Sequence, residues 1–183
     1  DPGIEKENYR YIHDLTGPKM IFLTREVEKR LELNSGISWF PDTLPVTPET
    51  FVPEPPSGGF DKEKCAEIIF TSGSTGKPKG VMISHKNLVA NTESIVEYLQ
   101  LTEDDRMLVV LPFYYCYGLS LLHTHLRAGG SIVFYNSFIF LGGVLKALLD
   151  YKCTGFAGVP SHFQILLRKS DSFKQTRFPD LKY

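Results

Sequence analysis

The residues best suited to chemistry lie in one short stretch, 71–80, with the sequence TSGSTGKPKG. It combines three glycines with four hydroxyl side chains and the ammonium groups of Lys77 and Lys79. Glycine lets backbone amides approach a ligand closely, and amide, hydroxyl and ammonium donors together suit phosphate oxygens. A flexible Gly/Ser linker would explain the small residues but not this concentration of donors. The stretch therefore predicts a phosphate-binding loop.

The spacing of this stretch differs from that of the P-loop NTPases. Their pattern, GxxxxGK followed by Ser or Thr, opens a helix directly after the lysine. Here only two residues separate Gly73 from Gly76, Pro78 follows Lys77, and an apolar run resumes at Val81. The loop is therefore expected to join two strands and to wrap around phosphate.

Short apolar runs alternate with helical periodicity on both sides of the loop. We expect strands over 67–70, 80–84, 107–111, 131–135 and 154–158, and helices over 84–100, 118–127, 142–151 and 161–169. Ser84 and Ser161 are the expected N-caps of the first and last of these helices. Apolar strands separated by helices indicate an α/β fold with a mostly parallel sheet covered by helices on both faces.

The first 64 residues are less regular. A strand is expected over 19–24 and a charged helix through Glu26 and Leu33, followed by a connector rich in proline between residues 41 and 59. We therefore divide the chain into a partial N-terminal segment over 1–64 and an α/β subdomain over 65–183 that carries the phosphate loop.

Composition and charge exclude several classes of protein. Twenty basic against 21 acidic residues leave a net charge of -1, so the chain has no global basic field for nucleic acid. Three widely spaced cysteines fit neither a disulfide framework nor a CxxC metal site and indicate reduced thiols. Since residues 1–7 also lack the pattern of a signal peptide, we expect a cytoplasmic protein. The uncharged stretch 107–126 contains Pro112 and Gly118, which favours a strand, a loop and a core helix over a membrane span.

Residues 70–81, FTSGSTGKPKGV, and 84–87, SHKN, resemble the phosphate-loop signature of the adenylate-forming (AMP-binding) enzymes. That superfamily includes acyl-CoA synthetases, peptide-synthetase adenylation domains and firefly-type luciferases. The resemblance extends over residues 65–183 and more weakly over 1–64. It implies part of the large N-terminal domain, with the remaining N-terminal subdomain and the C-terminal lid domain lying outside this chain.

The resemblance implies a ligase that uses ATP and Mg²⁺ to convert a carboxylic acid into an acyl adenylate and pyrophosphate. An acyl thioester with CoA, or with the phosphopantetheine of an acyl carrier protein, would follow. Carried over by position, Thr71 and Lys79 would act in catalysis, and the β and γ phosphates would be held by Thr71, Ser72, Gly73, Ser74, Thr75, Gly76, Lys77 and Lys79. Because the family's Mg²⁺ ligand lies in a segment beyond Tyr183, no metal ligand is assigned in this chain.

A second cluster, PFYYCYG over 112–118, directly follows an apolar strand. Ligands of open α/β sheets bind outside the carboxyl ends of the strands, and the resemblance implies that Tyr115, Tyr117, Gly118 and Gly158 line the acyl side of the site. Tyr115 stands where the family often has histidine. Filling of the core by these rings is the competing interpretation. His123 and His125 are two residues apart on one predicted helix, so they make a poor metal pair.

One alternative to the ligase stays open at this level. The chain could be a phosphate- or nucleotide-binding module without catalysis, because the adenine-binding turn, the acidic Mg²⁺ segment and the C-terminal lysine of the family are not in it. We expect the chain by itself to be inactive. Neither the acid, the acyl acceptor nor the oligomeric state can be predicted from these residues.

Overall fold

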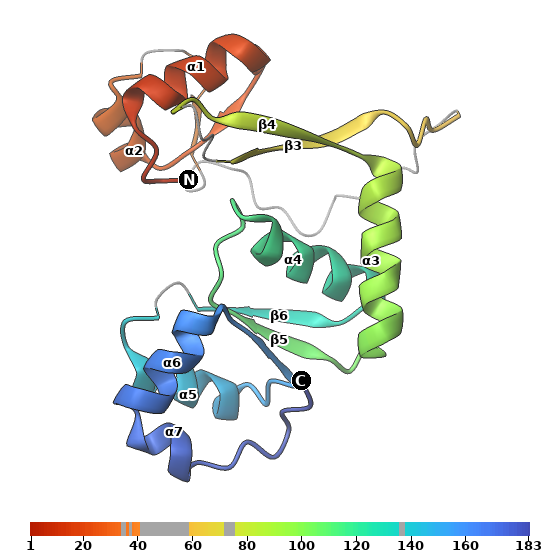
Figure 1. Ribbon diagram of the computed structural model, residues 1–183, viewed down its shortest axis with the longest axis vertical. Coiled ribbons are helices and arrows are strands. Elements are labelled where there is room, and N and C mark those ends of the chain that lie inside the picture. Colours follow the sequence, from red (N-terminus) through yellow and green to blue (C-terminus); the bar gives the residue numbers. More distant parts are fainter. Residues whose placement is uncertain (34–35, 37, 41–58, 72–75, 136–137) are drawn as a thin grey trace. The chain divides into compact units, whose positions relative to one another are not determined.

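The computed structural model describes residues 1–183 except 34–35, 37, 41–58, 72–75 and 136–137 (Figure 1). The chain divides into two compact units. The first comprises Asp1–Asp61 and Phe70–Val81, and the second comprises Lys62–Ile69 and Met82–Tyr183. Most of the predicted proline-rich connector lies outside the described residues.

The described residues of the first unit include two short helices and a two-stranded parallel sheet. Its elements are α1 (Lys6–Thr16), β1 (Ile21–Phe22), α2 (Arg25–Leu31) and β2 (Ser38–Trp39). The Thr24 hydroxyl caps α2 by accepting from the Val27 amide. The strand and the charged helix predicted here are confirmed, both over fewer residues, whereas α1 was not predicted.

Strands β3 (Cys65–Thr71) and β4 (Lys79–Ser84) pair with each other in a separate two-stranded sheet. The two strands predicted on either side of the loop are thereby confirmed, whereas residues 72–75 of the loop itself lie outside the described residues. The described part of the connection, residues 76–78, consists of Gly76, Lys77 and Pro78.

Helix α3 (His85–Leu99) begins and ends where the sequence predicts. The Ser84 hydroxyl accepts from the Asn87 amide at 3.2 Å, and the Asn87 side chain accepts from the Ser84 amide at 3.1 Å. This reciprocal capping box satisfies two helix-end donors that would otherwise lack partners. Gln100 ends the helix with φ 54°, in the left-handed region.

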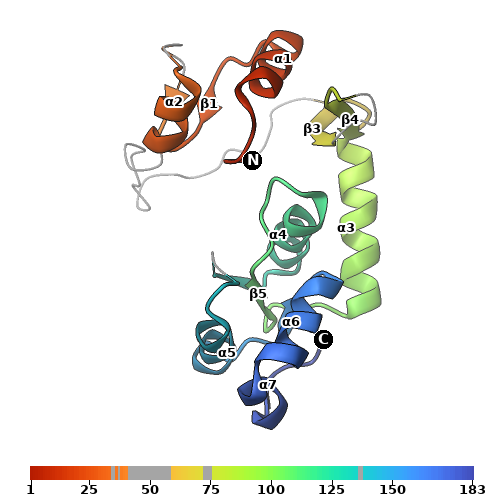
Figure 2. The same cartoon turned by 60° about the vertical axis from the view of Figure 1, so that its left-hand side comes forward.

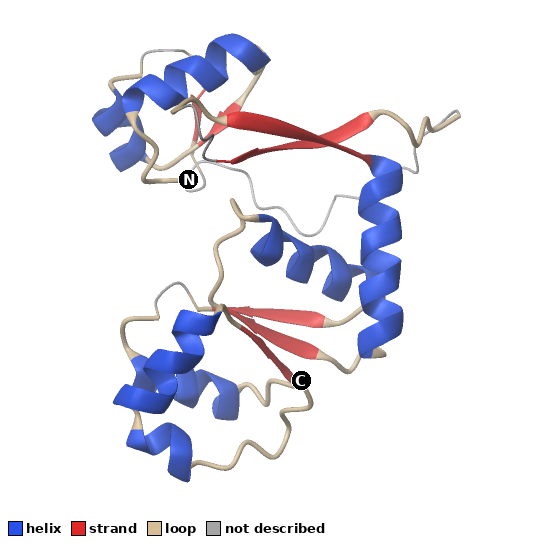
Figure 3. Cartoon of the chain, in the orientation of Figure 1, coloured by secondary structure: helices blue, strands red, loops and turns tan. Residues whose placement is uncertain are grey.

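The second unit is built on a three-stranded parallel sheet in the order β6, β5, β7 (Figure 3). Val109 of the central strand is aligned with both Phe134 and Ala157, so the three carboxyl ends share one edge. The elements are β5 (Arg106–Val109), α4 (Cys116–Ala128), β6 (Ser131–Phe134), α5 (Leu141–Asp150), β7 (Gly155–Ala157), α6 (Pro160–Lys169) and α7 (Asp171–Gln175). This arrangement confirms the predicted α/β fold.

Alternate residues of β5 belong to two different cores. Met107 and Val109 pack with Leu121 of α4, while Leu108 packs with Val144 of α5. In Figures 1 and 2 the strand lies between these two helices. The side chains of a strand alternate between its faces, so the sheet is covered on both sides, as predicted.

Residues 107–126 divide into β5, a loop and α4, and no helix in the described ranges has the length and hydropathy needed to cross a membrane. The expected N-cap Ser161 is wrong, because Val159 occupies that position and Pro160 is the first helical residue. Proline suits this position since its fixed φ matches the helix and its missing amide donor is not needed there.

Candidate functional site

The described flanks of the predicted phosphate loop meet at its base. Thr71 is the last residue of β3 and Lys79 the first of β4, and the Thr71 hydroxyl donates to the Lys79 carbonyl oxygen at 3.5 Å. The structure thus brings the two predicted catalytic residues to the same point of the sheet. Ser72, Gly73, Ser74 and Thr75 lie outside the described residues, so their assigned contacts stay predictions.

Gly76 has φ 85°, in the left-handed region that side chains rarely adopt. Apart from Gly76 and its chain neighbours, no atom of the described residues lies within 4 Å of the position that a Cβ would occupy there. The glycine is therefore required by the backbone conformation and not by crowding. A Cβ at this position would strain the turn that leads into Lys77 and Lys79.

The loop carries positive charge that no carboxylate among the described residues neutralises. Lys77 and Lys79 are exposed, and neither forms an ion pair within the described part of the chain. The Lys77 ammonium instead lies 5.4 Å from the centroid of the Tyr11 ring, on α1. No motif around Tyr11 could have predicted this contact. The arrangement leaves the N–H donors of both lysines available to an anion.

The aromatic cluster after β5 separates into one packed ring and three exposed ones. Phe113 packs against the core, whereas Tyr114, Tyr115 and Tyr117 are 40%, 60% and 45% exposed. Tyr115 is the N-cap residue of α4, and its ring lies 4.8 Å from that of Tyr114. Core filling therefore explains Phe113 but not the tyrosines, which stay candidates for contact with a ligand.

Gly118 has a structural explanation of its own. A Cβ there would lie 2.8 Å from the carbonyl carbon of Pro112 and 3.0 Å from the carbonyl oxygen of Leu111. Only glycine allows the first turn of α4 to approach the preceding loop this closely. This packing shapes the loop that carries Tyr115, and the assignment of Gly118 to substrate binding stays a prediction.

Gly158 follows β7 at the same sheet edge where Tyr115 follows β5. A Cβ at Gly158 would lie 3.3 Å from Nδ1 of His162, whose ring stacks on Phe138 at 4.2 Å. Nδ1 is buried without a hydrogen-bond partner among the described residues, and burial lowers the pKa of His162. A neutral imidazole therefore accompanies the predicted acyl side, and no sequence motif around His162 predicts it.

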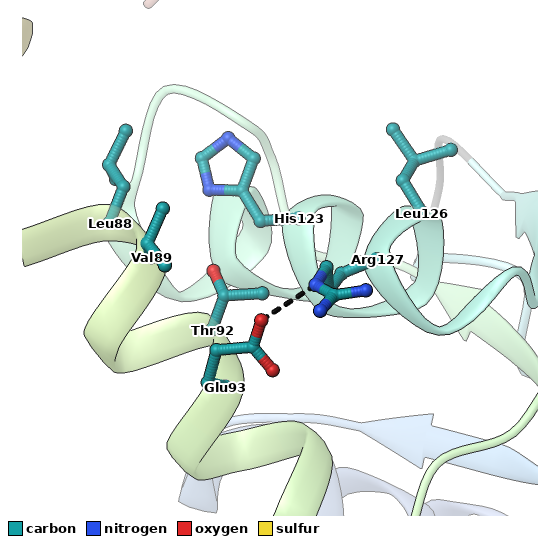
Figure 4. Close-up of a pocket in the computed structure, with 7 residues that line it drawn as sticks. All are labelled: Leu88, Val89, Thr92, Glu93, His123, Leu126 and Arg127. Carbon is teal, nitrogen blue, oxygen red and sulfur yellow. Dashed lines mark hydrogen bonds and ion pairs between the residues drawn. The ribbon is translucent and has the colours of Figure 1, made fainter. Parts of the chain in front are cut away.

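A pocket of about 270 Å³ lies between α3 and α4, away from all predicted site residues (Figure 4). The Arg127 Nε donates to the Glu93 Oε1 at 2.7 Å beside it. His123 also faces Glu67 of β3, at 3.4 Å between Nε2 and Oε1. The lining residues are Leu88, Val89, Thr92, Glu93, His123, Leu126 and Arg127.

The cysteines and histidines form no metal centre in the described part of the chain, where no group of three or more His, Cys, Asp or Glu could hold an ion. All three cysteines are free thiols, as predicted. His125 is buried and contacts the Leu121 carbonyl and the Tyr183 hydroxyl, whereas His123 faces Glu67. The two histidines therefore have separate surroundings.

Several relatives of this chain are acyl-CoA ligases or synthetases. Acyl-CoA ligase sidI of Beauveria bassiana is 38% identical over 117 residues, which is 63% of this chain and 19% of that protein. Feruloyl-CoA synthase of an Amycolatopsis species is 34% identical over 115 residues, covering 62% and 23% of the two chains. The aligned part thus corresponds to about a fifth of the length of its curated relatives.

Structural comparison supports the same fold. The ATP-bound MatB of Rhodopseudomonas palustris matches with a TM-score of 0.75 at 23% identity, over 98% of this chain and 37% of that one. The sequence model of the AMP-binding enzyme family matches residues 1–183. Because this match extends over the whole chain, and the loop between β3 and β4 has the expected setting, the chain belongs to the AMP-binding enzyme family.

Proposed function

We propose that these residues are part of the N-terminal domain of an ATP-dependent ligase that activates a carboxylic acid. The observation that carries this proposal is the loop between β3 and β4, with Thr71 and Lys79 at its base and two ammonium groups free of carboxylate partners in the described chain. Membership of the AMP-binding family and the acyl-CoA ligases among the relatives support it.

In the proposed first step, a carboxylate oxygen of the acid attacks the α-phosphorus of ATP. The bond from this phosphorus to the oxygen that bridges to the β-phosphate breaks, and its electron pair leaves with pyrophosphate. The Lys79 ammonium and the Thr71 hydroxyl stabilise the charge that develops on this leaving group. In the second step the sulfur of CoA or phosphopantetheine, which loses its proton to water, bonds to the acyl carbon. The bond from this carbon to the phosphate oxygen breaks, and AMP leaves with the electron pair.

The loop residues fit phosphate and not a metal ion. Amides, hydroxyls and ammonium groups are hydrogen-bond donors, whereas Mg²⁺ takes oxygen ligands such as carboxylates. When bound, Mg²⁺ neutralises phosphate charge. We propose that its protein ligand lies outside this chain, in the further segments of the enzyme.

On the acyl side, the proposal places Tyr115, Tyr117, Gly118 and Gly158 at the carboxyl edge of the parallel sheet. Aromatic rings and the neutral His162 favour an apolar acyl group over a highly charged one. We propose cytoplasmic activity, on the strength of the free thiols. The proposed division into a segment over 1–64 and a subdomain over 65–183 leaves the second N-terminal subdomain and the lid domain outside the chain.

Exchange of pyrophosphate into ATP tests the proposal in a full-length protein that carries these residues. Lys79→Ala should slow acid-dependent exchange about 10- to 150-fold, equivalent to about 1.5–3 kcal/mol for a hydrogen bond to a charged group. Lys146→Ala is the matched control, because Lys146 is exposed, pairs with Asp150 and lies outside the signature. Normal exchange in Lys79→Ala would remove this lysine from the mechanism.

Two further outcomes separate the alternatives. The 183-residue chain alone should bind pyrophosphate weakly and show no acid-dependent exchange, and clear exchange would contradict the proposal that catalysis needs further segments. Pyrophosphate binding without exchange in the full-length protein, tested with a panel of acids, would instead favour a non-catalytic phosphate-binding module.

A further inference from the structure

We propose that Tyr11 is a positioning residue that holds the Lys77 ammonium ready for the polyphosphate of ATP. This inference rests on the proposed function, because it takes the loop as the phosphate site. The observation behind this inference is a contact outside the sequence motif: the centroid of the Tyr11 ring on α1 lies 5.4 Å from the Lys77 Nζ of the loop. Both residues belong to the same compact unit.

The Tyr11 ring lies on α1, and contacts with α2 hold this helix in place. Lys6, in the first turn of α1, pairs with Glu32 at the end of α2. The Arg30 guanidinium of α2 donates to the carbonyl oxygens of Pro2 and Ile4, at 2.5 and 2.9 Å, just before α1 begins. Tyr11 therefore belongs to a helix that several contacts hold in place, and Lys77 contacts this helix instead of another loop.

An aromatic face suits this task better than a carboxylate would. Its quadrupole attracts the ammonium but neither neutralises the charge nor occupies the N–H donors. A carboxylate in the same place would compete with phosphate for Lys77. A free lysine side chain also loses rotamer freedom when it binds, and the ring removes part of that freedom in advance.

The consequence is an effect on affinity and not on the chemical step. Removal of the ring should weaken binding of inorganic pyrophosphate and of ATP about two- to fivefold, the range of an exposed cation–π contact. The ring does not touch the reacting atoms in this proposal, so kcat should stay within about twofold while KM for ATP rises.

The test uses the full-length protein and four variants: Tyr11→Leu, Tyr11→Phe, Lys77→Met and the double variant Tyr11→Leu/Lys77→Met. Calorimetry with pyrophosphate gives Kd, and exchange kinetics give KM and kcat. Tyr11→Leu should weaken binding, Tyr11→Phe should retain it, and Tyr11→Leu should have no further effect once Lys77 is methionine. Tyr98→Leu on α3 is the control, since Tyr98 is an exposed tyrosine outside the loop.

Replacement of Tyr11 by phenylalanines of increasing fluorine content keeps the ring in place, but the fluorine atoms progressively weaken its quadrupole. Pyrophosphate affinity should fall steadily along this series, which guards against a Tyr11→Leu variant that fails to fold. Constant affinity along the series, or a full Tyr11→Leu effect in the Lys77→Met background, would overturn the inference. Lys79→Ala separates the two proposals: if it weakens pyrophosphate binding while the Tyr11 series does not, only the role of Tyr11 fails, and if neither does, the phosphate site itself fails.

Discussion

The Thr154 hydroxyl donates a hydrogen bond to the Asp105 carboxylate, with 2.9 Å between Oγ1 and Oδ1. The same carboxylate accepts from the Thr102 amide at 2.8 Å and from the Lys182 ammonium at 3.1 Å. Asp105 is only 2% exposed. One buried side chain therefore joins the entry to β5, the entry to β7 and the segment that follows α7.

Asp105→Asn should lower the free energy of unfolding of the chain by about 2–3 kcal/mol, because hydrogen bonds to a buried charge are lost or weakened. Urea unfolding measures this change. Asp104→Asn is the matched control, because Asp104 is exposed, and it should alter stability by less than about 0.5 kcal/mol. Equal effects of the two substitutions would contradict the role given to Asp105.

The contribution of Asp105 should also depend on pH. Burial acts to raise the pKa of Asp105, but hydrogen bonds from Thr102, Thr154 and Lys182 outweigh it and the pKa is lowered. A lowered carboxyl pKa stabilises the folded chain above the unfolded pKa of about 3.9, and this is lost as the pH falls through the folded pKa. The stability difference between the wild type and Asp105→Asn should therefore shrink below about pH 4, measured by urea unfolding across that range.

His125 and Tyr183 form a second buried contact, 3.2 Å from Nε2 to the hydroxyl. Nδ1 of His125 lies 2.9 Å from the Leu121 carbonyl, which assigns the proton to Nδ1 and makes Nε2 the acceptor. Tyr183→Phe should therefore cost about 1 kcal/mol of stability near neutral pH, the net value of one hydrogen bond. Tyr98→Phe, at an exposed ring on α3, should leave the unfolding midpoint unchanged.

Stability should fall on both sides of neutrality because of this pair. Burial lowers the pKa of His125, so its contribution is present above the unfolded pKa of about 6.5 and is lost as the pH falls through the folded pKa. Burial also raises the pKa of Tyr183 to about 12. Stability should then decline as the pH rises above about 10, where only the unfolded tyrosine ionises, and Tyr183→Phe should lose this alkaline decline.

Ser84→Ala should lower the free energy of unfolding by about 1 kcal/mol, since it removes the N-cap hydroxyl of α3. Thermal or urea unfolding measures the loss. Ser94→Ala, on the exposed side of the same helix, is the control and should be neutral or slightly stabilising, because alanine favours helix interiors. A Ser84→Ala variant as stable as the control would argue against the capping box.

The three cysteine thiols should react with a thiol reagent at different rates. Cys65 and Cys116 are exposed and should react promptly with a thiol reagent, whereas Cys153 is buried and its pKa is raised by burial. Cys153 should react only when the chain unfolds, because the thiolate is the reactive form. Cys153→Ser should leave the prompt phase intact and abolish the slow one, and a slow phase that persists in it would show that another thiol is protected.

The α/β part of the fold can be predicted because local residue patterns mark the starts of its helices and its buried strands. Ser84 and Asn87 specify a helix start, and the apolar runs of β5, β6 and β7 specify buried parallel strands. Helix α1 gave no such signal, because Glu5 precedes it without a side-chain cap and none of its residues is buried. The short α7 follows Ser170 and ends at Gln175, one turn that periodicity cannot reveal.

The candidate site also has features that the sequence predicts and features that it does not. Dense donors predict a phosphate-binding loop because their chemistry is local to the sequence. Contacts between distant segments, such as Tyr11 with Lys77 or Phe138 with His162, leave no local pattern. Nor does the sequence distinguish the packed Phe113 from the exposed Tyr115, because all the rings of the cluster have similar apolar character.

The alternation along β5 has a thermodynamic consequence. Met107 and Leu108 are adjacent in sequence but contact different helices across opposite faces of the sheet. Substitutions at Met107 and Leu121 share a core and should couple, whereas substitutions at Met107 and Val144 should add. The central strand therefore separates the two cores energetically, so that a substitution in one core should not change the stability effect of a substitution in the other.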